Sequence, residues 1–312
     1  MLKQITILIC AFAFSFANEV VFSQSNPPRQ KEVTRKWTFI ANSDIFISQI
    51  ETIQTPLYFF TQKVGVPASN VYYYIPNTPK LGFGVGASVA LNEMFNLSFQ
   101  YRYLRSGAHQ TTETEKSPDL VVNISLFPIS LPESNLKAHI EGNLMEHVYI
   151  ADLMIQMSSS LTSKILIQPF AGIVTIRHNE NFIVSAYDMD NPSRRGVSKI
   201  RSEKTSNGIL IGLDIRFIIN NFFYFFSSLK TTLTSLAKNK QAFDGFNDFG
   251  APASFSETTY NVSQIIDHHW NYRFGVAFNH AFKDNWVLSL RIFTEMHSSL
   301  FENYAFGATV VF

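Results

Sequence analysis

Residues 270–282 read WNYRFGVAFNHAF, and almost every second residue of this stretch is bulky and apolar. Trp270, Phe274 and Phe278 belong to one set, whereas Asn271 and Arg273 belong to the other. Successive side chains of a β-strand point to opposite faces, so this period of two predicts a strand with one apolar face and one small or polar face.

The same alternation recurs along the chain, and its two faces differ in composition. The apolar faces are rich in Phe, Tyr and Trp, and the opposite faces carry Gly, Ala and Ser. A soluble sandwich also alternates, but its wet face would favour charge. Aromatic girdles outside and small or polar residues inside are typical of an outer-membrane β-barrel. Further alternating stretches are residues 81–91, 95–103, 209–217, 286–293 and 304–312.

Composition and charge narrow the class of protein. The chain has 312 residues, of which 46% are hydrophobic and 16% are charged, whereas soluble domains have about 25% charged residues. Its formal net charge of +1 gives no basic surface for nucleic acid. The most apolar stretch, residues 209–226, contains Asp214 and Arg216, so it is no membrane helix. If the chain meets a membrane, it does so as a closed barrel.

The N-terminus has the pattern of a secretory signal. Residues 1–17 read MLKQITILICAFAFSFA, with Lys3 before an apolar run and small residues at Ser15 and Ala17. A lipoprotein signal at Cys10 is disfavoured because the preceding Ile9 is not small. We expect a signal peptide over 1–17, a periplasmic segment over 18–36 and a barrel over 37–312. The mature chain then has no cysteine and no disulfide.

Short turns alternate with long polar connections, which predicts an up-and-down antiparallel barrel of about ten strands, with a range of eight to twelve. Short turns are expected on the periplasmic side, with both chain ends. Residues 57–64 and 183–187 are assigned to outer hairpins. A β-bulge is expected near Tyr149, where the apolar positions change parity, which puts Glu141 on the lumen face. The predicted strands are residues 37–50, 81–91, 95–105, 136–157, 164–177, 207–217, 222–236, 260–282, 286–297 and 303–312.

Three blocks of sequence resemble a known family. They are residues 81–106, with the Gly-rich strand LGFGVGASVAL, residues 136–178, with IADL and QPFAG, and residues 270–312. Together they resemble the major-outer-membrane-protein-like family of pore-forming proteins known from legionellae and chlamydiae. The resemblance implies an outer-membrane channel. Gln168 stands where the family usually has Arg, and the cysteines of chlamydial members are absent, so disulfide cross-linking is not implied.

The last strand carries a second signal. Gly307, Val310 and the terminal Phe312 match the assembly signal of outer-membrane barrels, although Ala305 replaces the usual polar residue. We therefore expect the barrel assembly machinery to be a partner. The alternative is an edge strand that ends in an aromatic residue, since strands favour aromatics.

The lumen face carries the candidate functional residues. Their positive excess predicts a preference for anions, because rings of Arg and Lys select that way. The candidate pore-lining residues are Gln100, Arg102, Asp214, Arg216, Lys230, Arg273, Arg291 and Glu295.

Other motifs have simpler explanations. The GFGVG of residues 82–86 lacks the third glycine and the following helix of a dinucleotide loop. Adjacent strand residues His268 and His269 point to opposite faces and cannot chelate a metal together. Residues 188–191 lack the glycine of a calcium loop. No cofactor and no metal are expected, and without a Ser/His/Asp signature we expect no enzyme, although a barrel enzyme is a third alternative.

We therefore predict a porin in the cell outer membrane through which small polar solutes diffuse passively. The expected partners are outer-membrane lipid and small polar solutes, oligomers are possible, and nucleic acid is not expected. The alternative is a closed barrel that acts as a surface adhesin or structural envelope protein through its long loops. This alternative has weight because about eight strands leave an interior that side chains just fill.

Overall fold

The computed structural model describes residues 39–50, 56–62, 71–74, 78–92, 94–114, 120–126, 129–134, 137–248, 253–261, 266–281, 287–297 and 301–311. This part of the chain is all-β, and it contains no helix long and apolar enough to span a membrane. Predictions for residues 1–38 and for Phe312 lie outside the described residues.

The strands are β1 (Phe39–Ile50), β2 (Pro56–Gln62), β3 (Val71–Tyr74), β4 (Thr78–Ala90), β5 (Phe95–Glu113), β6 (Leu120–Leu126), β7 (Ile129–Ser134), β8 (Ala138–Met157), β9 (Ser159–Thr162), β10 (Ile165–Asp188), β11 (Arg195–Asn220), β12 (Phe223–Asn247), β13 (Ala253–Asn261), β14 (Ile266–Ala281), β15 (Val287–His297) and β16 (Phe301–Val311).

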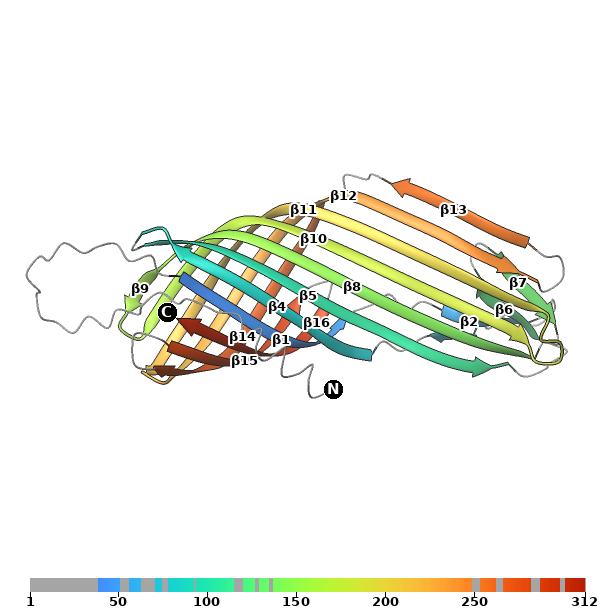
Figure 1. The fold of residues 1–312 in the computed structure, drawn as a ribbon, viewed down its shortest axis with the longest axis horizontal. Coiled ribbons are helices and arrows are strands. Elements are labelled where there is room, and N and C mark those ends of the chain that lie inside the picture. The colour runs from blue at the N-terminus through green and yellow to red at the C-terminus, as the bar shows by residue number, and fades with distance from the viewer. Residues whose placement is uncertain are drawn as a thin grey trace, which may run out of the picture.

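Ten of these strands close into a ring. Each pairs antiparallel with its two neighbours, in the order β1, β4, β5, β8, β10, β11, β12, β14, β15 and β16, and β16 returns to β1. Figure 1 shows the strands wrapping around this ring. The predicted up-and-down barrel is confirmed, and each of its ten predicted strands overlaps one strand of the ring.

Asparagine side chains build two of the short turns. Asn92 Oδ1 accepts hydrogen bonds from the backbone N–H groups of Met94 and Phe95, both at 2.8 Å, between β4 and β5. Asn220 Oδ1 accepts from the N–H of Phe222 at 2.9 Å between β11 and β12. Such side-chain bonds mimic a backbone turn, which is why Asn marks these positions in the sequence.

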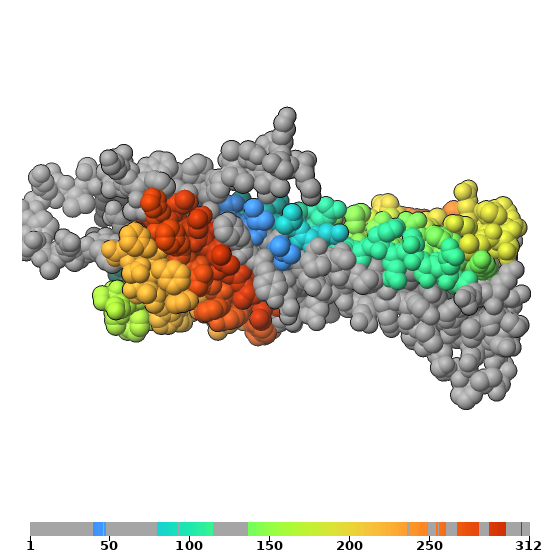
Figure 2. Space-filling model, turned by 90° about the horizontal axis from the view of Figure 1, so that it is seen from below, coloured from blue at the N-terminus to red at the C-terminus, as the bar shows by residue number. Residues whose placement is uncertain are grey.

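An apolar belt surrounds the barrel at the end that carries the short turns. The edge of the belt farther from these turns, which we call the belt edge, is a row of mutual Cα partners on β5, β8, β10, β11 and β12. Their side chains are between 42% and 58% exposed. Figure 2 shows the packed wall formed by the gold to red segments of β12, β14 and β15. A soluble monomer rarely exposes an apolar surface of this extent, so the belt faces lipid and the barrel is transmembrane. The edge residues are Phe99, Leu153, Ile173, Ile209 and Leu233.

Five strands continue far beyond the belt and form what we call the extension. β10, β11 and β12 have 24, 26 and 25 residues, whereas about 9–11 residues of strand cross a membrane. β13 pairs with the outer part of β12. A separate sheet of order β3-β2-β6-β7 lies at this end, where β6 approaches β10 and β11 (Figure 1). The extension comprises β13 and residues 104–113, 138–148, 178–188, 195–204 and 239–247.

On β8, most inward side chains of the extension are apolar and most outward ones are polar. On β8 the inward side chains of Ile140, Leu144 and Val148 are buried and apolar, whereas the outward Glu141 pairs with the exposed His109 at 3.7 Å. The predicted bulge near Tyr149 is wrong, because the pairing of β8 with β5 and β10 runs through that residue without a register shift. The change in apolar parity reflects a change of surroundings: the outer face meets hydrocarbon below Tyr149 and water above it.

The same change of surroundings explains the underestimated strand lengths. Residues 183–187 belong to β10 rather than to a hairpin, and residues 195–206 and 237–247 are strand rather than loop. The predicted strand over 260–282 divides between β13 and β14. These segments carry polar outer faces, so they lack the aromatic alternation that identified the membrane strands. Of the stretch 57–64, the described part is β2, which pairs with β3 and β6.

Candidate functional site

The interior of the barrel is bridged by an ion pair between distant strands. Arg102 on β5 bonds through Nη1 to Glu295 Oε1 on β15. In the ring, β4, β1 and β16 separate these two strands, so the pair is a chord across the lumen rather than a contact along the wall. Both side chains are buried.

A second chord lies beside the first. Asp152 Oδ2 on β8 accepts a hydrogen bond from Lys230 Nζ on β12 at 2.7 Å, across the width of β10 and β11. The same oxygen accepts from Arg102 Nη2 at 3.2 Å. Asp152 therefore joins the two chords, because Arg102 is shared between Asp152 and Glu295.

Glu295 collects further donors. Asn271 Nδ2 donates to Glu295 Oε1 at 2.7 Å, and Arg273 Nη2 lies 3.4 Å from that oxygen. These contacts complete a lumen network of four charged bonds and one amide bond. The lumen network comprises Arg102, Asp152, Lys230, Asn271, Arg273 and Glu295. Closer to β1, Arg291 Nη2 donates to Asp44 Oδ1 at 2.7 Å.

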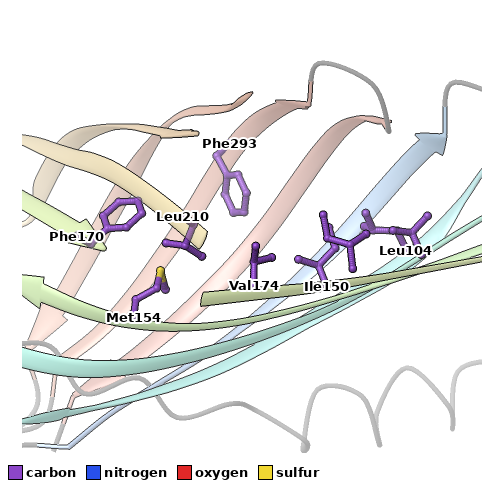
Figure 3. Packing of buried hydrophobic residues seen from close by; sticks show 9 residues of the cluster. Leu104, Ile150, Met154, Phe170, Val174, Leu210 and Phe293 are labelled. Atoms are coloured by element: carbon purple, nitrogen blue, oxygen red, sulfur yellow. The ribbon is translucent and has the colours of Figure 1, made fainter. Parts of the chain in front are cut away.

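Apolar side chains pack around the lumen network. Leu104, Ile150, Met154, Phe170, Val174, Leu210 and Phe293 project into the interior from five strands (Figure 3). The Phe226 and Phe293 rings meet at 5.9 Å between centroids, and the Arg273 guanidinium lies 4.8 Å over the Phe293 ring. A side chain at Gly212 would collide with the Phe170 ring, so the glycine makes room for that ring inside the barrel.

A small cavity adjoins the lumen network. Its volume is about 40 Å³, which is room for about three or four water molecules at about 10–15 Å³ each. Within the described residues, Arg102 Nε, Asp152 Oδ1 and Arg273 Nε are buried and have no hydrogen-bond partner from the protein. The cavity is lined by Gln100, Arg102, Asp152, Met154, Gln156, Phe170, Asp214, Ser228, Lys230, Asn271 and Arg273.

The structure places the eight predicted pore-lining residues inside the ring. Arg102, Lys230, Arg273 and Glu295 are members of the lumen network, and Gln100 and Asp214 line its cavity. Arg216 lies 5.8 Å over the Tyr224 ring, whose hydroxyl contacts the buried Ser289 at 3.2 Å. Their assignment to a conduction path stays a prediction.

Among the described residues, the candidate pore-lining set lacks Asp44, Asp152 and Asn271, which bond to its members in the interior. The alternation had placed Asn271 on the same face as Arg273, and it could have found the other two, because Asp44 precedes the outward Ile45 and Asp152 lies between Ala151 and Leu153. Of the assembly signal, Gly307 is buried with Asp44 opposite it in the β1–β16 pairing, Val310 pairs with Ala41, and Phe312 lies outside the described residues.

The other motifs lie as strand geometry requires. Gly82, Gly84 and Gly86 are inward positions of β4. His268 Nε2 lies 2.7 Å from Thr231 Oγ1, whereas the His269 ring lies 5.3 Å from the ring of His297, so the two adjacent histidines have different surroundings.

No family model and no curated protein matches the chain. Among solved structures, it is similar to the outer membrane protease OmpT from Escherichia coli, at 11% identity, 87% of this chain, 95% of that chain and a TM-score of 0.37. It is similar to the monoaromatic hydrocarbon channel CymD at 11% identity, over 88% of this chain and 87% of that chain, with a TM-score of 0.31. It is also similar to an outer membrane channel from Pseudomonas putida F1 at 8% identity, over 92% of this chain and 98% of that chain, with a TM-score of 0.28.

These comparisons correct one expectation. The prediction that the chain is no enzyme, which rested on the lack of a Ser/His/Asp signature, is contradicted, because an outer membrane protease is among the solved structures to which the chain is similar. Outer-membrane barrels thus include both enzymes and channels, and the fold alone does not choose between them.

Proposed function

We propose that this chain is an outer-membrane channel for small polar solutes and ions, in which the lumen network forms the constriction. The observation that carries the proposal is the set of buried charged atoms around the cavity that have no partner in the described protein, namely Arg102 Nε, Asp152 Oδ1 and Arg273 Nε. Buried polar groups are hydrogen-bonded to protein or water, so these atoms indicate a hydrated interior.

Stability alone gives a poor reason for such an interior. Taking charges out of water costs several kcal/mol per ion, and well-packed apolar residues of similar volume are often as stabilising as a buried ion pair. A barrel built only as an anchor would be served by an apolar interior. Charges held in the lumen are the means by which channels select ions.

The sign of the lining supports a preference for anions. The interior cations are Arg102, Arg216, Lys230, Arg273 and Arg291, and the carboxylates are Asp44, Asp152, Asp214 and Glu295. In this described part of the lumen, five cations face four carboxylates, which leaves a positive excess around the lumen network. The resemblance to the major-outer-membrane-protein-like family agrees with a pore and stays a prediction.

Arg102 offers a direct test, because it takes part in both chords. The Arg102→Ala variant leaves Glu295 with Arg273 and leaves Asp152 with Lys230, so neither carboxylate loses its last cation. In planar bilayers we expect the wild-type protein to show small discrete conductance steps and Arg102→Ala to show larger ones. Arg105→Ala, on the exposed outer face of the same strand, is the matched control and should leave the step size unchanged.

The outcome that would contradict the channel is the lack of steps in both the wild-type protein and Arg102→Ala when both are folded. That result would favour the second candidate, a closed barrel with a function at its outer surface. The observation behind this candidate is that the two chords cross the lumen and leave only about 40 Å³ beside them. It predicts that replacing Ala253–Asn261 by a Gly/Ser linker lowers binding of expressing cells to their target surface.

A further inference from the structure

A row of aromatic and polar residues crosses the outer wall above the apolar belt, with one further row of outward residues between them. Tyr103, Tyr149, Arg177, Thr205 and Lys238 are successive Cα partners on β5, β8, β10, β11 and β12. We call them the boundary row. The belt edge lies closer to the short turns than the boundary row does. The two are four residues apart on β5, β8, β10 and β11, and five residues apart on β12.

The tyrosines of the boundary row form a connected group. The rings of Tyr103 and Tyr149 lie 5.2 Å apart, the Phe83 ring lies 5.3 Å from Tyr103, and the Tyr103 hydroxyl contacts His147 Nδ1 at 2.6 Å. Tyr is enriched where a protein crosses from hydrocarbon to headgroups, because the ring is apolar and the hydroxyl is polar. The boundary row therefore lies at headgroup depth.

A hollow of about 460 Å³ opens in the wall at this depth. Its lining combines two aromatic rings with hydroxyl, amide and guanidinium groups, which is a mixed surface unlike the belt below it. The lining residues are Tyr101, Tyr149, Ala151, Thr175, Arg177 and Asn179.

Arg177 is held in place at this hollow by its neighbours. Its Nε donates to Asn179 Oδ1 at 3.2 Å, and its Nη2 pairs with Glu203 at 3.0 Å. Lys238 lies 3.8 Å from the same Glu203 oxygen, and Arg105 is exposed on β5 two residues from Tyr103. Arg177 and Lys238 thus share one carboxylate at headgroup depth, and this positive excess is complementary to phosphate.

We propose that this hollow binds the phosphorylated headgroup of a membrane glycolipid, with Arg177 at the phosphate. The hydroxyls of Tyr101, Tyr149 and Thr175 and the Asn179 amide are suited to sugar hydroxyls, and the hollow is larger than a single phosphate needs. The acyl chains then lie along the belt over Ile173 and Leu153. The extension lies at the opposite end from the short turns, and outer-membrane barrels direct their short turns to the periplasm, so the lipid belongs to the outer leaflet.

Native mass spectrometry of the full chain in detergent tests the proposal. We expect the wild-type protein to retain diphosphoryl lipid A more strongly than monophosphoryl lipid A or phosphatidylcholine. Arg177→Gln should weaken the binding of diphosphoryl lipid A about fivefold, since a cation at the membrane surface contributes about 1 kcal/mol. Arg201→Gln, an exposed arginine on β11 in the extension, is the matched control and should bind as the wild type does.

Two results would overturn the proposal. One is equal binding of diphosphoryl lipid A by the wild-type protein and Arg177→Gln, and the other is equal binding of all three lipids by the wild-type protein. If Arg177→Gln fails to fold, Arg177→Lys and Lys238→Gln serve in its place. The charge-retaining Arg177→Lys should then bind more tightly than Lys238→Gln, and the reverse order contradicts the role of Arg177.

Discussion

Arg102 and Glu295 are 193 residues apart in the chain and form a buried ion pair across the barrel. Glu295 also accepts from Asn271 and Arg273, so one carboxylate neutralises two guanidinium groups. Without Glu295, Arg273 loses its carboxylate partner and Asp152 alone faces both Arg102 and Lys230, so buried positive charge is left without a counter-charge, which costs more than the pair itself contributes.

Glu295→Ala should therefore lower the free energy of unfolding by about 3–5 kcal/mol. Urea unfolding in detergent micelles measures this change. Glu203→Ala removes the partner of the more exposed Arg177 and Lys238 on the outer wall and should cost no more than about 1 kcal/mol. Equal effects of the two variants would contradict a buried network in the lumen.

The apolar belt predicts a cost that depends on depth. Ile211 is 56% exposed on the belt, and Asn207 lies four residues further along the same face of β11, above the belt edge. In lipid vesicles, Ile211→Lys should lower folding stability by about 2–4 kcal/mol and Asn207→Lys by about 0–1 kcal/mol. Reversible folding into vesicles across a urea series gives both values. If Asn207→Lys costs as much as Ile211→Lys, the belt does not face hydrocarbon.

A pair of carboxylates in the extension predicts a pH dependence. Glu180 on β10 stands directly opposite the buried Glu146 on β8. Burial raises the pKa of Glu180, and the Glu146 charge adds to this, while His178 and Lys204 oppose it. The folded state therefore holds the Glu180 proton more tightly than the unfolded chain does.

Protonated Glu180 therefore stabilises the folded state fully below the ordinary glutamate pKa of about 4.3. This stabilisation is lost as the pH rises through the raised pKa of the folded state. We expect Glu180→Gln, which mimics the protonated acid, to remove this loss, so that its melting temperature exceeds that of the wild type at neutral pH but not at pH 4. Thermal unfolding followed by circular dichroism provides the comparison. Glu257→Gln, on exposed β13, should leave the pH profile unchanged.

Gly212 and Phe170 predict a compensating pair. A Cβ at position 212 would lie 2.6 Å from Phe170 Cε2 and 2.5 Å from the Leu229 carbonyl oxygen. Overpacking of this kind costs about 1–3 kcal/mol, so Gly212→Ala should be destabilised by that amount. Phe170→Leu in the Gly212→Ala background should restore part of the loss, because the ring can be removed but the carbonyl cannot. An additive double variant would show that the ring does not occupy this space.

The membrane strands could be predicted because lipid imposes a strong rule on them. Hydrocarbon outside and small or charged residues inside produce the alternation of residues 81–91 and 270–282, and Asn92 and Asn220 mark the turns between strands. The ten strands of the ring and the inward placement of Arg102 and Glu295 follow from this rule. The sequence could not show which charges meet, because the chords join strands that are not neighbours.

The extension could not be read in the same way, because no single rule governs its faces. Above Tyr149 most outward residues of β8 are polar and most inward ones apolar, with the buried Glu146 as an exception, so the parity changes although the strand does not. In the sequence, a bulge and a change of the surrounding medium both shift the apolar residues from even to odd positions, so the two cannot be distinguished there. The hollow beside Arg177 was missed for a related reason: its six lining residues come from three strands and share no motif.

β8 is held by two independent constraints, because its inward face is continuous from Ala138 to Met157 while the medium on its other side changes near Tyr149. A slide of β8 by one residue against β10 would turn every side chain over. A slide by two residues would leave each inward side chain inward, yet it would carry His147 to the level of Tyr149 and Tyr149 into the apolar zone. The immersion depth of the barrel is thus encoded separately from its in-and-out pattern, by the few outward residues at which water gives way to hydrocarbon.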